Sequence, residues 1–186
     1  IELAITASTG IAATHIGGMT IHSWTGIGIK TKLDKHDLRN IDSNQYIVKR
    51  VRHAKVLIVE EVSMLLPGTL SMVDIVCREI KQNPEPFGGM QIVFSGDFFQ
   101  LPPVVKKEIE ESSARFAYDS PAWAEADPIV CYLTEQYRQD DSNFLDILSA
   151  IRHNVFNSDH LRHLETRIID PLDFASLPPN APKLFS

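Results

Sequence analysis

The sequence predicts an α/β fold, in which a mostly parallel sheet is flanked by helices. Short apolar, β-branched runs at residues 3–7, 55–59 and 90–94 have the length and the flanking turns of buried strands. Between them lie stretches of helical pattern, such as residues 69–82, where apolar side chains recur at steps of three and four. Strands that alternate with helices in this way form parallel sheets with right-handed crossovers.

The first strand, residues 3–7, ends at the polar residues 8–10. Gly10 introduces a short helical stretch over residues 11–16, which a pair of glycines ends. Thr20 has the side chain of a helix cap, and we expect it to begin one more short turn of helix that extends to Trp24.

The middle of the chain contains the second and third strands. Residues 34–53 have a weakly helical, polar and basic pattern, which indicates an excursion on the surface. The strand at 55–59 shows no alternation of polar and apolar residues, so we expect helices to cover both of its faces. The helix over 69–82 follows, and Gly88-Gly89 forms a turn before the strand at 90–94.

The last part of the chain contains a further strand and further helices. In order, the pattern predicts a charged loop over 106–114, a helix that begins at Pro121, a fourth strand over 129–133, a helix around residues 144–151, a helix over 159–167 and a linker over 171–186. Asp141 or Ser142 should cap the helix around 144–151.

Composition limits the class of protein. With 44% hydrophobic and 23% charged residues, the 186 residues are typical of one soluble globular domain, without a membrane-length apolar run or a signal peptide. Cys77 and Cys131 are isolated in apolar surroundings, which favours buried thiols and a reducing compartment. The net charge of −6 argues against coating duplex DNA, but permits a local groove for a single strand. Ile1 is not a methionine, so we expect a fragment.

Two carboxylates end the second predicted strand. Burying an ionised carboxylate is costly without a partner, so Glu60 and Glu61 should lie at the exposed end of the strand near a cation. A magnesium–nucleotide complex meets this need, because one carboxylate would hold the metal and the next would orient or deprotonate the attacking water. The alternative is a strand end that continues into a helix cap, with both glutamates solvated.

The third predicted strand delivers Asp97 and Gln100 into an irregular loop that two prolines close. Open α/β sheets bind their ligands outside the carboxyl ends of the strands, so this loop is a candidate site. The alternative is a core strand followed by a surface loop, in which Phe98 and Phe99 belong to the core.

Five motifs stand in a recognisable order: TASTGIAA from Thr6, GGMTIHSW from Gly17, VLIVEEVSML from Val56, GGMQIVFSGDFFQLPPV from Gly88, and LTEQYRQ from Leu133. Together they resemble the motor core of the Pif-type (petite integration frequency) DNA helicases, which are related to the RecD-like superfamily-one helicases. The resemblance implies an incomplete RecA-like P-loop NTPase motor domain over residues 1–140, without its P-loop strand. It also implies a helical connection towards the strand-splitting insertion over 141–186.

The resemblance assigns contacts with single-stranded DNA. Ser8, Thr9 and Gly10 resemble the motif that grips the backbone of the strand through amides and hydroxyls. His22 and Trp24 resemble a stretch whose aromatic residue lies against the bases, with Trp in place of the family's Phe. The alternative for Trp24 is an ordinary core aromatic.

The resemblance also implies ATP and Mg²⁺ as cofactors. Glu60 falls at the magnesium-binding position, where the family usually has Asp, and Glu61 falls on the catalytic glutamate. Gln100 matches the glutamine that senses the terminal phosphate, and Arg138 matches the arginine that stabilises the charge developing there. Without the resemblance, Arg138 would more often be a surface salt-bridge partner.

Two departures from the family matter. The phosphate-binding loop G-x-x-x-x-G-K-[ST] is missing, since the nearest string, GIGIKT from Gly26, has the wrong spacing. In the family this loop precedes TASTG, so we expect it before Ile1, and the second motor domain is missing as well. Glu60 in place of Asp lengthens the side chain by one methylene, although magnesium demands near-ideal octahedral geometry.

The leading hypothesis is therefore an internal piece of an ATP-dependent 5′-to-3′ DNA helicase that acts on single strands and forks in repair, recombination or telomere maintenance. A catalytically dead remnant that only binds single-stranded DNA is the alternative, and another nucleotide-dependent α/β enzyme is a weaker third. The resemblance implies an intracellular protein, in the nucleus or mitochondrion if the source is eukaryotic. We expect no ATPase activity from the isolated 186 residues.

Overall fold

The computed structural model describes residues 2–103, 116–135, 137 and 140–169. The chain divides into two compact units, Ile1–Cys131 and Tyr132–Ser186. The roles predicted for residues 1–140 and 141–186 stay predictions.

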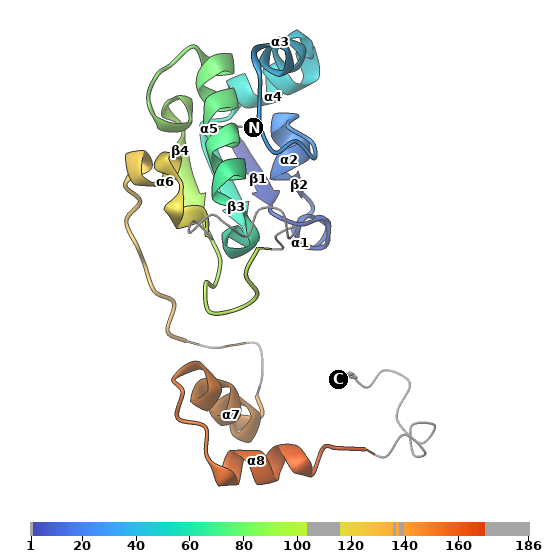
Figure 1. Cartoon of the computed structure of the whole chain (residues 1–186), viewed down its shortest axis with the longest axis vertical. Helices are drawn as coiled ribbons and strands as arrows, with labels where there is room; N and C mark the ends of the chain where they lie inside the picture. Colours follow the sequence, from blue (N-terminus) through green and yellow to red (C-terminus); the bar gives the residue numbers. More distant parts are fainter. Residues whose placement is uncertain (1, 104–115, 136, 138–139, 170–186) are drawn as a thin grey trace. The chain divides into compact units, whose positions relative to one another are not determined.

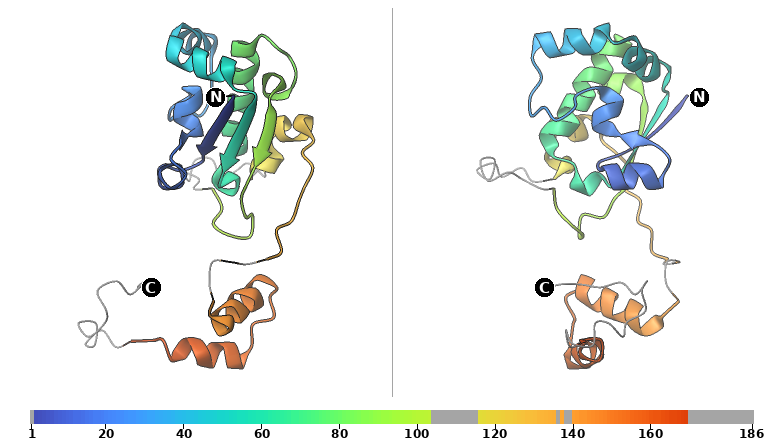
Figure 2. Two further views of the ribbon diagram at one scale, coloured as in Figure 1. Left: turned by 180° about the vertical axis from the view of Figure 1, so that it is seen from behind. Right: turned by 90° about the vertical axis from the view of Figure 1, so that its right-hand side faces the viewer.

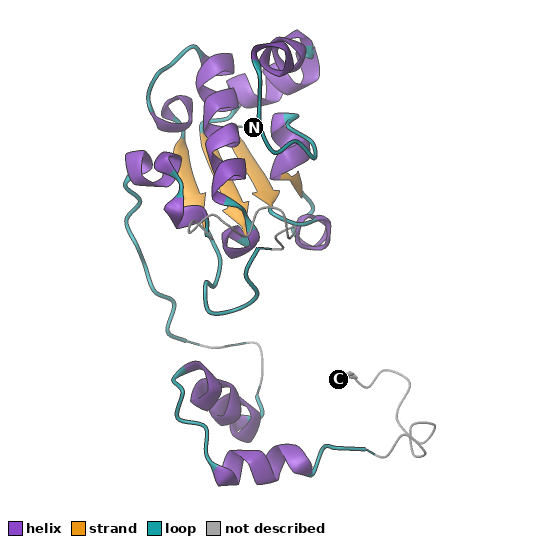
Figure 3. Ribbon diagram, viewed as in Figure 1, coloured by secondary structure: helices purple, strands orange, loops and turns teal. Residues whose placement is uncertain are grey.

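A parallel sheet forms the centre of the first unit (Figures 1 and 3). Its strands are β1 (Leu3–Ala7), β2 (Met19–Thr20), β3 (Val56–Glu60) and β4 (Gln91–Phe94), in the spatial order β2-β1-β3-β4. All neighbouring strands run parallel. The predicted fold class and its first three strands are confirmed. The short β2 was not predicted, because two residues carry no readable period.

The helices of the first unit begin where the sequence provides caps. They are α1 (Gly10–His15), α2 (Ile21–Thr25), α3 (Lys35–Ser43), α4 (Gln45–His53), α5 (Pro67–Lys81) and α6 (Pro121–Ala126). The Thr20 side chain accepts a hydrogen bond from the Ser23 amide, which confirms the predicted cap of α2. Pro121 is the first residue of α6, where its missing N–H costs nothing.

Helix α5 covers the centre of the sheet. Its apolar stripe, which includes Val73 and Val76, is buried with Leu57 and Val59 of β3 in one hydrophobic core. Burial of such side chains stabilises the fold by about 1.5 to 3 kcal/mol each. The core therefore holds β3, and the two glutamates that follow Val59, in a fixed place.

Within the described residues of this unit, helices cover one face of the sheet and leave the other open, as both views of Figure 2 show. Leu3, Ile5 and Val93 are exposed hydrophobic side chains, and Ile58 is half-buried. The register pairs Ile5 with Ile58 and Ile58 with Val93, so these side chains share one face. The prediction that β3 is covered on both faces is wrong for these residues. An unbroken apolar run indicates that both faces of a strand are suited to burial. It does not show whether a helix of the same unit covers each face.

Residues 34–53 form α3 and α4, so their helical pattern is confirmed. They are not simply a surface excursion, because Ile41, Ile47 and Val51 are buried in the core. Few apolar residues among many charged ones weaken the sequence signal, yet these three lie on the inward side of their helices. Helix α4 thereby packs against both α2 and α5.

The predicted strand over residues 129–133 does not form. The segment has no regular secondary structure, and Ile129 and Leu133 are 92% and 99% exposed. A strand needs a neighbour for its backbone N–H and C=O groups. Within the described residues no strand pairs with this segment, so its β propensity is not expressed.

The second unit contains two helices, α7 (Ser142–Arg152) and α8 (Ser158–Glu165). The Asp141 side chain accepts hydrogen bonds from the amides of Asn143 and Phe144, which settles the cap of α7 in favour of Asp141. His160 Nε2 lies 3.0 Å from an oxygen of Asp146 and links the two helices. None of the helices in the described part of the chain is long and apolar enough to span a membrane.

Candidate functional site

The carboxyl ends of β1, β3 and β4 meet at one edge of the sheet. The amide of Ser8, just after β1, donates to the carbonyl of Glu60 at 3.0 Å. The amide of Val62, just after β3, donates to the carbonyl of Ser95 at 2.9 Å. Three loops from distant parts of the sequence are thus joined by backbone hydrogen bonds, at the edge where open α/β sheets bind ligands.

The two predicted carboxylates lie at this edge. Glu60 is the last residue of β3 and Glu61 follows it, and both are partly exposed. Among the described residues neither makes an ion pair. Both carboxylates therefore lie at the partly exposed end of β3, and a cation as their partner stays a prediction.

The backbone of Glu61 is strained. Its φ of 55° and ψ of 41° lie in the left-handed region, which a residue with a Cβ seldom adopts. Such strain costs about 1 to 3 kcal/mol, and it clusters at functional sites. The 3₁₀ turn η1 (Val62–Met64) follows directly, so the strand conformation ends at Glu61.

Two buried hydroxyl groups flank the carboxylates. Ser8 and Ser63 are 9% and 1% exposed, and within the described part of the chain their Oγ atoms have no hydrogen-bond partner. A buried unpaired hydroxyl costs free energy, so such groups call for a water, ion or ligand. Carboxylates with nearby hydroxyls are the oxygen donors that Mg²⁺ prefers, so the residues of this edge fit a magnesium–nucleotide complex.

The loop after β4 forms a tight turn that begins at Asp97 and ends at Gln100. The Gln100 amide nitrogen donates to the Asp97 carbonyl at 3.1 Å. Phe98 packs its ring against Phe116, Tyr118 and Trp123, with centroids 4.9 to 6.1 Å apart. The alternative of a core strand and a surface loop places both rings in the core. Phe98, which packs against the core, agrees with it, whereas the exposed Phe99 does not.

Of the four residues predicted to act on the nucleotide, Glu60 and Glu61 lie at the carboxyl end of β3, and Gln100 lies in the loop that follows the adjacent strand β4. Arg138 lies outside the described residues. The role of each of the four stays a prediction.

Among the residues predicted to bind a single strand, Ser8, Thr9 and Gly10 lie at the start of α1. The Thr9 hydroxyl accepts from the Ala12 amide at 3.3 Å and caps this helix. Gly10 is exposed, and the space around a Cβ at this position would be open. Gly10 therefore leaves the backbone accessible at the same edge of the sheet.

Trp24 and His22 lie on α2. Trp24 is only 4% exposed and belongs to the hydrophobic core, which favours the alternative of an ordinary core aromatic. One part of its surface lines a cavity of about 350 Å³ that Tyr46 and Lys49 also line. His22 is half-buried, and this burial lowers its pKa below 6.5.

Arg50 is a residue that the sequence analysis missed. From α4 its Nε donates to the Trp24 carbonyl at 2.7 Å, and its Nη2 donates to the Ser23 carbonyl. Burial lowers the pKa of Arg50. The contact spans 26 positions, so no local pattern could reveal it. Arg50 holds the end of α2, and with it the stretch that carries His22.

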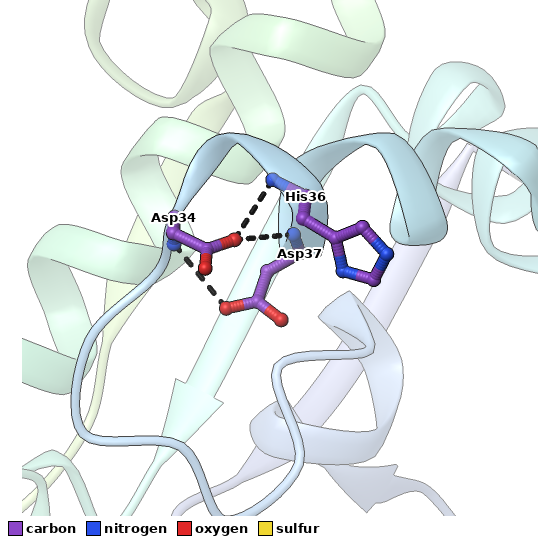
Figure 4. Close-up of side chains that lie close together, drawn as sticks. All are labelled: Asp34, His36 and Asp37. Atoms are coloured by element: carbon purple, nitrogen blue, oxygen red, sulfur yellow. Dashed lines mark hydrogen bonds between the residues drawn. The ribbon is translucent and has the colours of Figure 1, made fainter.

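Asp34, His36 and Asp37 also lie close together, in a geometry compatible with a metal ion (Figure 4). The Asp34 side chain accepts from the amides of His36 and Asp37 at 2.8 and 2.7 Å, and Asp37 accepts from the Asp34 amide. Lys30 forms an ion pair with Asp37 at 2.9 Å. This is a capping box at the start of α3, so its carboxylates already have partners.

Comparison with known proteins gives a consistent set of similarities. Residues 2–160 match the family model described as PIF1-like helicase. The chain is 49% identical to the ATP-dependent DNA helicase Pif1 of Psychrobacter sp. (strain PRwf-1), over 84% of its own length and 24% of that protein's. It is 43% identical to the ATP-dependent DNA helicase RRM3 of Saccharomyces cerevisiae, over 85% of its length and 22% of that protein's.

Solved structures agree with these relatives. The Pif1 helicase from Candida albicans superposes with a TM-score of 0.78 at 38% identity, covering 87% of this chain and 36% of that one. The Pif1 helicase from Bacteroides in complex with ADP-AlF3 and ssDNA gives 0.75 at 31% identity, covering 87% and 38%. The sheet and its helices therefore correspond to a RecA-like motor domain. The chain spans about a quarter of the curated relatives' length.

Proposed function

Because the chain belongs to the PIF1-like helicase family, we propose that it is part of an ATP-dependent DNA helicase that couples ATP hydrolysis to movement along single-stranded DNA. The observation that carries the proposal is the strained Glu61 beside Glu60, at the edge where β4 also ends. Among the described residues Glu61 makes no ion pair. One solved structure of the Bacteroides Pif1 helicase is a complex with both ADP-AlF3 and ssDNA, which supports a nucleotide and a single strand as partners.

In this proposal Glu60 would hold Mg²⁺, directly or through water, and the metal would neutralise charge on the phosphates. Glu61 would accept the proton of the attacking water, from its place between the end of β3 and the turn η1. Gln100 contacts the terminal phosphate and the water, and Arg138 stabilises the charge that develops.

The finer features of the proposal rest on the resemblance. They are 5′-to-3′ polarity, action on forks, and a role in repair, recombination or telomere maintenance inside the cell, in the nucleus or mitochondrion if the source is eukaryotic. Ser8, Thr9 and Gly10 are the proposed contacts with the strand. His22 is a further proposed contact, and Trp24 has a smaller proposed part because it is buried.

A partial duplex with one single-stranded tail, either 5′ or 3′, tests the proposal. The intact protein should release the labelled strand from the 5′-tailed duplex only, and only with ATP and Mg²⁺. Glu61→Gln should abolish both unwinding and ATP turnover. Glu79→Gln, the same change on a residue of α5 away from this edge, should leave both intact. Unwinding that survives Glu61→Gln, or needs no ATP, would refute the proposal.

A catalytically dead remnant that only binds single-stranded DNA is the second candidate. It is favoured by Glu60, which is one methylene longer than the family's Asp. ATP turnover by the intact protein that Glu61→Gln abolishes would exclude it. The isolated chain, whose 186 residues contain no G-x-x-x-x-G-K-[ST] motif, should show no turnover in either case.

A further inference from the structure

Asp97 organises the turn that carries Gln100. Its Oδ1 accepts the Phe99 amide at 3.1 Å, and its Oδ2 accepts Gln100 Nε2 at 2.9 Å. Its carbonyl accepts the Gln100 amide at 3.1 Å. One residue therefore binds both the backbone and the side chain of Gln100.

The carboxylate determines which way the Gln100 amide faces. An ionised carboxylate only accepts hydrogen bonds, whereas a side-chain amide has an NH₂ group that donates and an oxygen that accepts. Gln100 must therefore direct Nε2 to Asp97. Its Oε1 and the second N–H of Nε2 remain for other partners. A neutral partner at position 97 would allow the amide to turn over.

The turn is held on both sides. Phe98 is anchored in the ring cluster with Phe116, Tyr118 and Trp123. Pro102 and Pro103 follow closely and restrict the backbone after the turn. The orientation of the Gln100 amide is thus the main freedom left at this position, and Asp97 removes it.

We propose that Asp97 is a positioning residue, which fixes the Gln100 amide with Oε1 as a hydrogen-bond acceptor for the attacking water. The remaining N–H of Nε2 can then reach an oxygen of the terminal phosphate, since that oxygen accepts and cannot bond to Oε1. The inference rests on the proposed ATP hydrolysis. It adds which atom of the Gln100 amide accepts a hydrogen bond from the water and which donates one to the phosphate.

The test is Asp97→Asn in the intact protein. The asparagine keeps the size of the side chain and the acceptor for the Phe99 amide. It presents an NH₂ group to Gln100, so the Gln100 side-chain amide must flip and direct its oxygen to residue 97. We expect kcat for ATP to fall at least about tenfold, with KM within about twofold, because an interaction of the transition state is lost. Asp119→Asn is the control, because Asp119 accepts the Phe116 amide at 2.9 Å in a comparable turn. It should keep full activity.

A rescue separates positioning from a structural role. Gln100→Glu alone places two carboxylates against each other and should reduce kcat strongly. In the double variant, Asp97→Asn with Gln100→Glu, the new amide donates to the new carboxylate, whose second oxygen is again an acceptor. The kcat of the double variant should therefore exceed that of Gln100→Glu, but not that of Asp97→Asn, because a carboxylate cannot donate to the phosphate oxygen. A double variant that is no faster than Gln100→Glu alone, at unchanged folding, would overturn the proposal.

Gln100→Ala distinguishes the inference on Asp97 from the proposed function. If Gln100→Ala lowers kcat about 100-fold while Asp97→Asn does not lower it, the role of Asp97 is wrong and the proposed function stands. If Gln100→Ala leaves kcat unchanged, the assignment of Gln100 fails, and the inference on Asp97 fails with it.

Discussion

Gly96→Ala should slow ATP hydrolysis by displacing Glu61. A Cβ atom at Gly96 would lie 3.0 Å from the backbone nitrogen of Val62 and 3.1 Å from that of Ser63. Comfortable contacts begin at about 3.5 Å, so the segment after Glu61 must retreat by a few tenths of an ångström. A shift of about 1 Å in an active site costs roughly a hundredfold in rate, so we expect kcat about three- to tenfold lower.

The assay is ATP turnover by the intact protein at saturating single-stranded DNA, with a thermal melt to check folding. Overpacking should also lower stability by about 1 to 3 kcal/mol. Gly68→Ala is the matched control, because a Cβ there meets open space in the first turn of α5. It should keep kcat and gain up to about 1 kcal/mol. A folded Gly96→Ala protein with unchanged kcat would refute the idea that the contact between these loops places Glu61.

Three further predictions concern the first unit. Asp74→Ala should destabilise the protein by about 2 kcal/mol, because it removes the acceptor of Arg78 Nε (2.9 Å) and of the buried Phe87 amide. A denaturant titration measures this, and an unchanged midpoint would contradict it. Iodoacetamide at pH 8 should label the exposed Cys131 in the folded protein. Cys77, whose pKa is raised by burial, should react only after the protein unfolds. Labelling of both in the folded protein would contradict the burial of Cys77. Burial lowers the pKa of His22, so the folded state favours the neutral imidazole. The stability that this provides is complete well above pH 6.5 and is lost as the pH falls through the lowered pKa. His22→Gln should therefore lose less stability than the unchanged protein in thermal melts between about pH 7 and 5, and an equal loss would contradict this.

The sequence was most informative where a pattern is local. Apolar runs located β1, β3 and β4, and the three-and-four spacing of Leu70, Val73, Val76 and Ile80 located α5. Caps were readable because a Thr or Asp side chain meets amides only two or three residues away, as Thr20 and Asp141 do. The carboxylates at the end of β3 could be placed at the edge of the sheet for the same reason.

Features that depend on distant partners were not readable. The single-sided cover of the sheet, the unpaired segment over residues 129–133 and the bonds of Arg50 to α2 are set by what lies beside each segment in space. The left-handed backbone of Glu61 could not be predicted either, because glycine is the usual sequence signal for this conformation and the position holds a glutamate. The bond between Asp97 and Gln100 was within reach, as two polar side chains three positions apart in a turn before prolines.

The central claim is that Glu60, Glu61 and Gln100 act on one bound nucleotide. The most direct measurement is a structure of the intact protein with Mg²⁺, ADP and aluminium fluoride. We expect Glu61 and Gln100 around the fluoride, each within about 3 Å or through one water, and Glu60 at the metal. A nucleotide bound elsewhere, or these side chains directed away from it, would contradict the claim.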